Sequence, residues 1–203
     1  SAVLAVPASH TDGSPGTVLI TAANPGIGLA LAREYAAAGW TLVTTARRPA
    51  DAADLKALAA AHPGRVSIEP LDILDHASID ALATRYQGRP IDIRINNAGI
   101  TGNRFQQVPG KLDYAEFRQV FETNVVAPLK ITDTFLPQVQ ASRLKKIVVI
   151  VNPGPVDTDM MKGAPIPLQS PAEAASRVIA VTTKATLEDT GRFSDYRGGE
   201  LPW

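Results

Sequence analysis

The sequence of 203 residues contains no cysteine, which excludes disulfide bonds, thiolate nucleophiles and cysteine-ligated metals. Histidine is scarce, because His10, His62 and His76 are the only three and lie far apart in the sequence. We therefore interpret them as surface residues and expect no metal site. No apolar run approaches the roughly 20 residues that a membrane-spanning helix requires, so no membrane association is expected.

An excess of charge of either sign is also absent, because lysine plus arginine and aspartate plus glutamate number 20 each. This balance gives no electrostatic reason to expect a nucleic-acid partner. Hydrophobic residues make up 45% of the chain and charged residues 20%, proportions that are typical of a globular protein with one well-filled core.

The first 16 residues, SAVLAVPASHTDGSPG, begin with apolar residues but carry no basic stretch and no long hydrophobic core. These features differ from those of a secretory signal peptide. We therefore expect residues 1–16 to form a flexible N-terminal arm and residues 17–203 to form one domain. A reducing cytoplasm is the default expectation for the compartment.

Short apolar segments alternate with longer segments of helical periodicity along the rest of the chain. Strands are expected at 17–21, 40–46, 65–72, 91–96, 145–151 and 191–196. Helices are expected at 26–39, at 51–62, from Asp75 to Tyr86, from Asp113 into the 130s, and from Ser170 onward. Continuously apolar strands separated by helices predict an α/β fold, a single Rossmann-like domain with a doubly wound parallel sheet.

Two loops follow the expected carboxyl ends of strands. Residues 101–112 are polar, and residues 152–169 are rich in proline and glycine. Doubly wound folds bind ligands at this edge of the sheet, so these loops are the expected location of a site. Arg94 is unusual, because an arginine inside a buried strand costs desolvation energy unless it is paired.

The stretch TAANPGIG, residues 21–28, lies between the first expected strand and the first expected helix. Gly26 and Gly28 would allow backbone amides at the positive helix N-terminus to approach a pyrophosphate. Taken alone, the pattern is equally typical of a tight strand–helix turn without a ligand.

Further motifs give this turn a context: Asp72 after the third strand, INNAGI at 95–100, TNVVAP at 123–128, VNPGPVDTDM at 151–160 and GRFSDYRGGELPW at 191–203. In this order they resemble the short-chain dehydrogenase/reductase family, and the last motif resembles its carbonyl-reductase and C-factor-like branch. The resemblance extends over nearly the whole chain from residue 17. It implies a Rossmann-like fold and hydride transfer between a nicotinamide cofactor and a small-molecule carbonyl or alcohol substrate.

The resemblance also implies roles for individual residues. The phosphate turn would be formed by Thr21, Asn24, Gly26, Ile27 and Gly28, and adenine would be flanked by Asp72 and Ile73. The ribose would be faced by Asn97, Ala98 and Gly99. The nicotinamide would be met by Pro153, Gly154, Val156 and Thr158. The catalytic relay would include Asn124.

Two residues depart from the family pattern in the phosphate turn. Ala22 replaces the first glycine of the motif, and it would be strained if that position requires a positive φ. Pro25 occupies a position where many NADP-binding relatives carry a basic residue.

The cofactor preference is expected to be set directly after the second strand, in TTARRP at 44–49. NAD-binding relatives usually place an acidic residue there to hold the ribose hydroxyls. This chain has no acid there, and Arg47, assisted by Arg48, could pair with a 2′-phosphate. We therefore expect NADP(H) rather than NAD(H), with a solvated basic corner as the alternative interpretation.

The stretch KKIVVIVNPG, residues 145–154, joins the fifth strand directly to the Pro-Gly loop. In relatives a catalytic Ser, a substrate loop, a helix carrying Tyr-x-x-x-Lys and a sixth strand intervene, a unit of roughly 30 residues or more. No Tyr-x-x-x-Lys occurs in this chain, and the nearest pattern, Tyr114-x-x-x-Arg118, is interpreted as part of an ordinary surface helix. The sequence therefore predicts a fold that lacks one strand–helix unit in its C-terminal half and an oxidoreductase that is impaired in catalysis.

Three hypotheses remain open: an NADPH-dependent carbonyl reductase, a non-catalytic relative that binds nucleotide or acts through a partner, and an incomplete chain derived from an active reductase. The missing unit also leaves two options for the last strand. Either 191–196 pairs directly with the fifth strand, or that sheet edge stays open to another chain. Relatives commonly dimerise through the long helix and the missing one, so a homodimer, although possible, would need a different interface.

Overall fold

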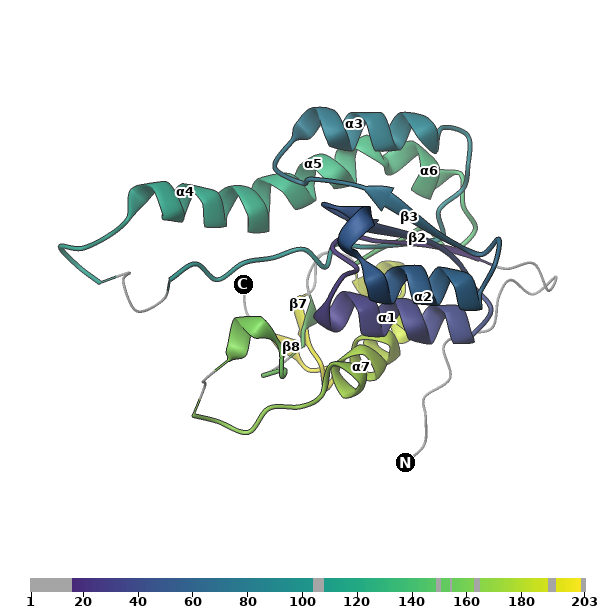
Figure 1. Ribbon diagram of the computed structural model, residues 1–203. Coiled ribbons are helices and arrows are strands. Elements are labelled where there is room, and N and C mark those ends of the chain that lie inside the picture. The colour runs from purple at the N-terminus through teal and green to yellow at the C-terminus, as the bar shows by residue number, and fades with distance from the viewer. Residues whose placement is uncertain are drawn as a thin grey trace.

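The computed structural model describes residues 16–103, 108–148, 151–153, 155–162, 165–189 and 193–201 (Figure 1). Gly154 and residues 1–15 of the expected arm lie outside these ranges. The central feature is a five-stranded sheet in the order β3-β2-β1-β4-β5, in which every neighbouring pair is parallel. Its strands are β1 (Thr17–Ile20), β2 (Thr41–Ala46), β3 (Val66–Pro70), β4 (Ile93–Ile95) and β5 (Lys146–Val148).

The strand order reverses between β1 and β4. From β1 the chain moves outward through β2 to β3, and it then returns to the other side of β1 for β4 and β5. Ile20 of β1 pairs with Thr44 of β2 and with Ile95 of β4, so the carboxyl ends of these strands meet at one edge. In an open α/β sheet, such a reversal leaves a crevice outside the carboxyl ends of the strands, where ligands bind.

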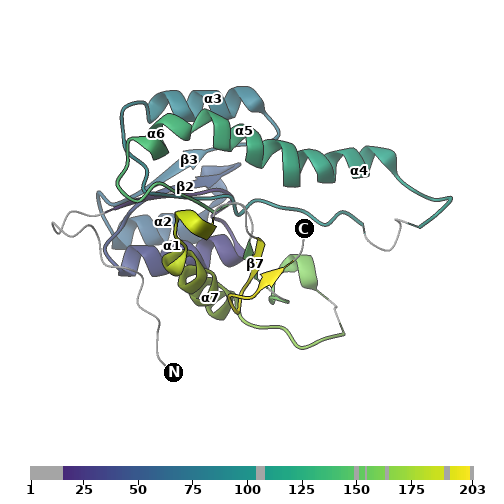
Figure 2. The ribbon, with the colours of Figure 1, turned by 180° about the vertical axis from the view of Figure 1, so that it is seen from behind.

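Helices cover both faces of the sheet (Figures 1 and 2). One face carries α1 (Gly26–Ala37), α2 (Ala53–Ala61) and α7 (Pro171–Lys184), and the other carries α3 (His76–Arg85), α5 (Ala127–Thr134) and α6 (Leu136–Gln140). Each face buries its own apolar cluster. In the first, Tyr35 and Trp40 meet edge to face with ring centroids 5.4 Å apart, and in the second Ile131 and Phe135 are packed. The predicted doubly wound α/β fold is confirmed.

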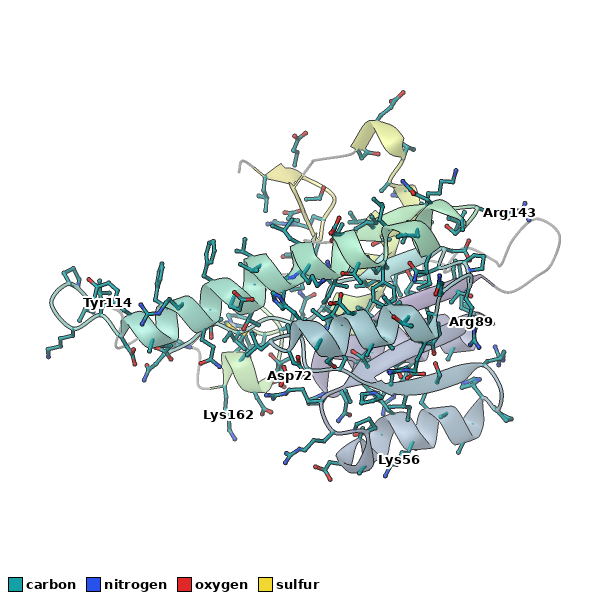
Figure 3. The ribbon with its side chains drawn as sticks, turned by 90° about the horizontal axis from the view of Figure 1, so that it is seen from above. Lys56, Asp72, Arg89, Tyr114, Arg143 and Lys162 are labelled. Atoms are coloured by element: carbon teal, nitrogen blue, oxygen red, sulfur yellow. The ribbon has the colours of Figure 1, made fainter. Side chains whose placement is uncertain are left out.

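The helix expected from Asp113 into the 130s is divided into pieces. Asp113 caps α4 (Tyr114–Phe121) by accepting hydrogen bonds from two backbone N–H groups of its first turn. A π-helical turn, η2 (Glu122–Val126), then joins α4 to α5. α4 extends away from the sheet with Tyr114 at its far end (Figure 3), and none of its residues is buried.

Side-chain caps fix the starts of two further helices, as the sequence predicts. Asp75 accepts a hydrogen bond from the N–H of Ala77 at 3.0 Å at the start of α3, and Ser170 and Glu173 form a capping box at the start of α7. Short 3₁₀ turns complete the described helices: η1 (Pro49–Asp51), η3 (Asp159–Met161) and η4 (Leu187–Asp189). Every helix in the described ranges is too short or too polar to span a membrane.

The single strand expected at 145–151 is a prediction that needs correction, because this stretch contributes to two sheets. β5 pairs with β4 in the central sheet, whereas β6 (Val151–Asn152) belongs to a separate three-stranded sheet in the order β6-β7-β8. β6 pairs in parallel with β7 (Phe193–Asp195), which pairs antiparallel with β8 (Glu200–Leu201). The C-terminal strand β7 therefore pairs with the stretch that precedes the Pro-Gly loop and not with β5 of the central sheet.

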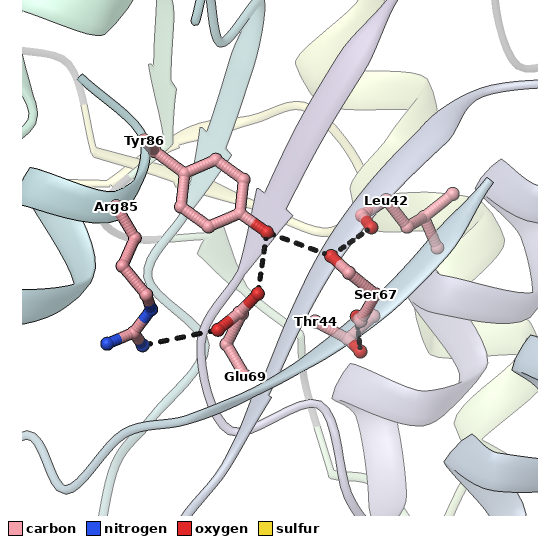
Figure 4. A network of polar contacts seen from close by, with 6 residues as sticks. All are labelled: Leu42, Thr44, Ser67, Glu69, Arg85 and Tyr86. Carbon is pink, nitrogen blue, oxygen red and sulfur yellow. Dashed lines mark hydrogen bonds and ion pairs between the residues drawn. The ribbon is translucent and has the colours of Figure 1, made fainter. Parts of the chain in front are cut away.

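A polar network fastens the edge strand β3 to α3 and to β2 (Figure 4). Glu69 of β3 accepts hydrogen bonds from the Tyr86 hydroxyl at 2.8 Å and from Arg85 Nη2 at 3.2 Å. Ser67 Oγ donates to the backbone carbonyl of Leu42 at 3.0 Å. Burial raises the pKa of the Tyr86 hydroxyl, which therefore stays protonated and donates to Glu69. The network holds β3, and with it the turn that follows β3, in place.

Arg94 lies inside β4 and is fully buried. Its guanidinium donates to Asn96 Oδ1 at 2.7 Å and to Thr132 Oγ1 at 2.6 Å, while its Nε has no hydrogen-bond partner among the described residues. Burial lowers the pKa of Arg94 to about 10, because the charged form is poorly solvated there. The desolvation cost expected from the sequence is therefore offset only in part, by hydrogen bonds to two neutral groups.

Candidate nucleotide-binding site

The turn after β1 and the segment after β4 are interlocked by side chains. The Thr21 hydroxyl accepts hydrogen bonds from the backbone N–H groups of Asn97 and Ala98, at 2.9 and 3.2 Å. Asn97 Nδ2 in return donates to the backbone carbonyls of Thr21 and Ala22, at 3.2 and 3.0 Å. Thr21 is fully buried. Its hydrogen bonds hold together the two segments that flank the reversal of strand order.

Gly28 permits this close approach. A Cβ at position 28 would lie 2.5 Å from the Ala22 carbonyl oxygen and 2.5 Å from Asn97 Nδ2, closer than side-chain atoms come in folded proteins. Gly26 has a φ of 71°, and Ala22 has a φ of 49°, in the left-handed region. The strain expected at Ala22 is therefore confirmed, at a cost of roughly 1–2 kcal/mol.

The N-terminus of α1 opens from this turn without a side-chain cap. Pro25 at the N-cap makes no side-chain hydrogen bond, and the first turn contains no acidic residue. By contrast, α3, α4 and α7 each begin with an aspartate or serine that caps them. The first N–H groups of α1 and its positive dipole end therefore remain available to an anion. Asn24 and Ile27 lie in the same turn and are half-buried.

The segment after β6 lies against the same turn, although the two are far apart in the sequence. A Cβ at Gly26 would be 3.4 Å from Thr158 Cγ2, an ordinary contact distance. Val156 is buried and forms an isolated parallel bridge with Gln169. Pro153 is half-buried, whereas Gly154 lies outside the described residues. The structure thus brings Thr158 next to the phosphate turn.

Asn124 lies in the π-helical turn η2 and fastens this turn to the segment after β4. Its Nδ2 donates to the Ile100 carbonyl at 2.7 Å, and its Oδ1 accepts from the Ile100 N–H at 2.9 Å. A Cβ at Gly99 would lie 3.4 Å from Asn124 Oδ1, so the segment passes close to the helix. π-helical turns occur frequently at functional sites. Both ends of the amide are engaged by backbone groups, so Asn124 here positions the residues that precede Ile100.

Arg47 and Arg48 follow β2 directly and are exposed. Arg48 Nε forms an ion pair with Asp51 Oδ2 at 3.0 Å. An exposed pair of this kind contributes only about 0–1 kcal/mol, and it occupies only one nitrogen of the guanidinium. The two arginines stand at the same edge of the sheet as the phosphate turn, because β2 pairs in parallel with β1.

Asp72 and Ile73 follow β3 at this edge. Asp72 is exposed, and its Oδ1 accepts a hydrogen bond from the Leu74 N–H at 3.0 Å, which shapes the turn before α3. Ile73 is half-buried and packs on the apolar cluster under α3 and α5. The predicted site residues thus come from the segments after β1, β2, β3, β4 and β6 and from η2.

All four tyrosines, which are the candidate proton donors of this chain, lie in the described ranges. Tyr35 is buried against Trp40, and burial raises its pKa. Tyr86 belongs to the network between β3 and α3, Tyr114 is exposed at the start of α4, and Tyr196 stacks against two arginines. Among the described residues, no hydrogen bond or cation–π contact joins a tyrosine to a lysine.

Sequence reasoning missed two residues that contact this region. Gln169 Nε2 donates to the Pro153 carbonyl, and Arg177 of α7 donates to Gln169 Oε1 at 2.8 Å. Their only signal in the sequence is their position around the start of a helix. That position does not distinguish them from ordinary surface residues.

The family model for short chain dehydrogenases matches residues 16–151, which contain the phosphate turn, the turn after β3, the segment after β4 and η2. This chain belongs to the short-chain dehydrogenase family. The match confirms the resemblance seen in the sequence motifs. The match includes every predicted site residue except those after β6.

Other short-chain dehydrogenases are similar in sequence and in structure. The uncharacterized oxidoreductase YusZ of Bacillus subtilis is 36% identical over 134 residues, which cover 64% of this chain and 46% of YusZ. The chain thus spans about half the length of such curated relatives. A carbonyl reductase from Pseudomonas aeruginosa, solved in complex with NADP, is 27% identical with a TM-score of 0.78, over 94% of this chain and 100% of that chain.

A third relative is similar along nearly the whole of this chain. The short chain dehydrogenase gsfK of Penicillium aethiopicum is 25% identical over 253 residues, in an alignment that covers 93% of this chain and 100% of gsfK. The alignment is longer than the 203 residues of this short-chain dehydrogenase, so some of its positions are gaps in this chain. The relative therefore contains residues that have no counterpart here.

Proposed function

We propose that residues 17–203 of this short-chain dehydrogenase form one domain that binds NADP(H) at the carboxyl edge of the sheet, and that its hydride transfer between carbonyl and alcohol is impaired. The turn after β1 carries this proposal, because Gly28 leaves no room for a side chain and α1 starts without a cap of its own. A dinucleotide phosphate fits this arrangement, since N–H groups and a positive helix end are left for it. The NADP bound to the Pseudomonas carbonyl reductase supports the same cofactor here.

Each predicted residue has a role in this proposal. Thr21 holds the turn in which the phosphates would be bound by Asn24, Gly26, Ile27 and Gly28. Adenine would be flanked by Asp72 and Ile73, and the 2′-phosphate would be paired with Arg47 and Arg48. The ribose would be faced by Asn97, Ala98 and Gly99. The nicotinamide would be met by Pro153, Gly154, Val156 and Thr158. Asn124 would belong to the catalytic relay and would also keep the ribose segment in place through Ile100.

The impairment follows from the groups that this chain can offer to a substrate. The bound cofactor would supply a hydride, and the chain would have to supply a proton to the oxygen that becomes an alkoxide. A tyrosine is a useful donor only when a neighbouring cation stabilises its phenolate, and the sequence contains no Tyr-x-x-x-Lys. A positioned general acid contributes about 10²- to 10⁴-fold to the rate. We therefore expect turnover to be lower than in active relatives by about this factor. An incomplete chain derived from an active reductase would share this loss.

A second candidate function, a non-catalytic protein that acts through a partner, is favoured by one surface. Along α4, η2 and α5, five large side chains are 40–65% exposed: Tyr114, Phe117, Phe121, Val125 and Leu129. Their spacing of three or four residues places them along one side of the helical segment, here called the α4 face. Exposed apolar patches of this kind are typical of protein interfaces.

We propose a second copy of this chain as the partner of the α4 face. In an antiparallel pair centred on Phe121, Tyr114 and Phe117 of one copy would lie opposite Val125 and Leu129 of the other. Large aromatic and smaller aliphatic side chains would then interdigitate. Sedimentation velocity should show a dimer at tens of micromolar protein and a monomer for Phe121→Lys. A monomeric unaltered chain at that concentration would rule out this homodimer.

Arg47→Ala is expected to raise the Kd for NADPH at least about tenfold, because a charge-assisted hydrogen bond contributes about 1.5–3 kcal/mol. The Kd for NADH, which has no 2′-phosphate, should change little. Fluorescence titration with each nucleotide measures both values. Arg48→Ala is the matched control and should have a smaller effect, because Asp51 already engages its Nε. An equal loss of NADH affinity in Arg47→Ala would show that Arg47 supports the loop instead.

A further inference from the structure

The segment proposed to meet the nicotinamide is held from outside by Gln169. The backbone N–H of Gln169 donates to the Pro155 carbonyl at 3.0 Å, and its carbonyl accepts from the Asp157 N–H at 2.8 Å. Its side-chain Nε2 also donates to the Pro153 carbonyl. One residue therefore fixes the segment at three points, and one of these points depends on the side chain.

Arg177 of α7 determines how the Gln169 amide is oriented. Arg177 Nη1 donates to Gln169 Oε1 at 2.8 Å. A flipped amide would place Nε2, which only donates, against a guanidinium, which also only donates. The guanidinium therefore keeps Oε1 toward α7 and Nε2 toward the Pro153 carbonyl.

Arg177 is in turn placed by the end of the chain. Its Cζ lies 5.0 Å from the centroid of the Tyr196 ring, and the Cζ of Arg197 lies 5.1 Å from the same centroid. Arg197 Nε pairs with Asp195 Oδ2 at 3.3 Å, at the end of β7. Cation–π contacts hold such side chains weakly but with a defined geometry. A continuous set of contacts thus connects β7, α7 and the segment after β6.

We propose that Gln169, oriented by Arg177, is a positioning residue for the nicotinamide half of the cofactor. This inference rests on the proposed function, because it assigns the segment after β6 to the nicotinamide. The described contacts of the Gln169 side chain go to Pro153 and Arg177 and to no residue of the phosphate turn. Loss of the side chain should therefore weaken binding of the nicotinamide half and spare the adenosine half.

The test compares two ligands by isothermal titration calorimetry: NADPH, and 2′,5′-ADP, which carries the adenosine phosphates without the nicotinamide. Gln169→Leu should raise the Kd for NADPH about tenfold, the effect of losing a net contribution of about 1.4 kcal/mol, and leave the Kd for 2′,5′-ADP unchanged. Arg177→Met should raise the Kd for NADPH by a smaller factor, and Arg177→Lys, which keeps one donor, should recover most of it. Lys184→Met, at the other end of α7, is the matched control and should alter neither value.

The outcomes separate this inference from the function on which it rests. If the unaltered chain binds neither ligand, the proposed function is wrong, and the role of Gln169 falls with it. If the unaltered chain binds both ligands but Gln169→Leu leaves the NADPH affinity unchanged, or weakens both ligands equally, the proposed function stands and the positioning role is wrong. Retained binding of 2′,5′-ADP also shows that each variant is folded.

Discussion

Gly28→Ala is expected to abolish measurable NADPH binding and to lower the free energy of unfolding by about 1–3 kcal/mol. The added Cβ would lie 2.5 Å from the Ala22 carbonyl oxygen and 2.9 Å from Ala23 Cα, and these backbone atoms cannot rotate away as a flexible side chain can. Relief of the clash requires the turn after β1 to move off α1, which breaks the hydrogen bonds donated by Asn97 Nδ2. The N–H groups proposed to bind the phosphates would be displaced with the turn.

Urea denaturation and fluorescence titration with NADPH measure these two effects. Gly199→Ala is the matched control, because a Cβ there would lie 3.4 Å from its nearest neighbour, Asp195 Oδ1, at ordinary contact distance. It should leave stability and binding nearly unchanged. An unaltered Kd for NADPH in Gly28→Ala would show that the phosphates are not bound at this turn.

Arg94→Met is expected to raise the free energy of unfolding by about 1–2 kcal/mol. Burial lowers the pKa of Arg94 from its ordinary 12.5 to about 10, which corresponds to destabilisation of the charged form on the order of 3 kcal/mol. Methionine is unbranched, carries no charge and fills the same buried space. It forfeits the hydrogen bonds to Asn96 and Thr132, but replacing buried charged groups by apolar side chains of similar volume is often net stabilising.

The gain from Arg94→Met should not depend on pH between roughly 6 and 9. The folded pKa lies below the unfolded one, so the penalty is fully present while Arg94 is charged in both states and is relieved only as the pH rises through about 10. Urea denaturation at several pH values measures this. Arg94→Lys is the control and should be less stable than the unaltered chain, because a lysine cannot reach Asn96 and Thr132 with a fork of donors. A destabilised Arg94→Met would mean that the two hydrogen bonds outweigh the desolvation.

The fold was predictable because its signals are local. Buried parallel strands such as β1 and β2 are continuously apolar, and helix starts such as Asp75 and Ser170 carry their caps within a few residues. The phosphate turn was also predictable, since Gly28 is required by contacts with Ala22 and Ala23 of the same turn and with Asn97 of the INNAGI motif. The motifs of the family predicted the remaining candidate residues, which follow the strands at the same edge of the sheet.

The features that were not predicted depend on partners that are distant in the sequence. Within 145–151, β6 pairs with β7, which lies more than 40 residues further along the chain. The hydrogen bonds of Arg94 depend on Thr132, which only the packing of α5 brings to β4. Likewise, Gln169 is an ordinary polar residue in the sequence, and only the folded chain places its amide between Pro153 and Arg177.

We propose that this chain binds NADP(H) but lacks the groups that deliver a proton to substrate. The most direct test follows NADPH fluorescence over time as the chain is mixed with NADPH and an aromatic aldehyde. We predict that the enhancement of fluorescence over that of free NADPH saturates with NADPH concentration. The signal should then decay at least about 100-fold more slowly than with an active reductase, because the bound cofactor is oxidised slowly. An enhancement that does not saturate would contradict NADPH binding, and a fluorescence decay at the rate of an active reductase would contradict the impairment.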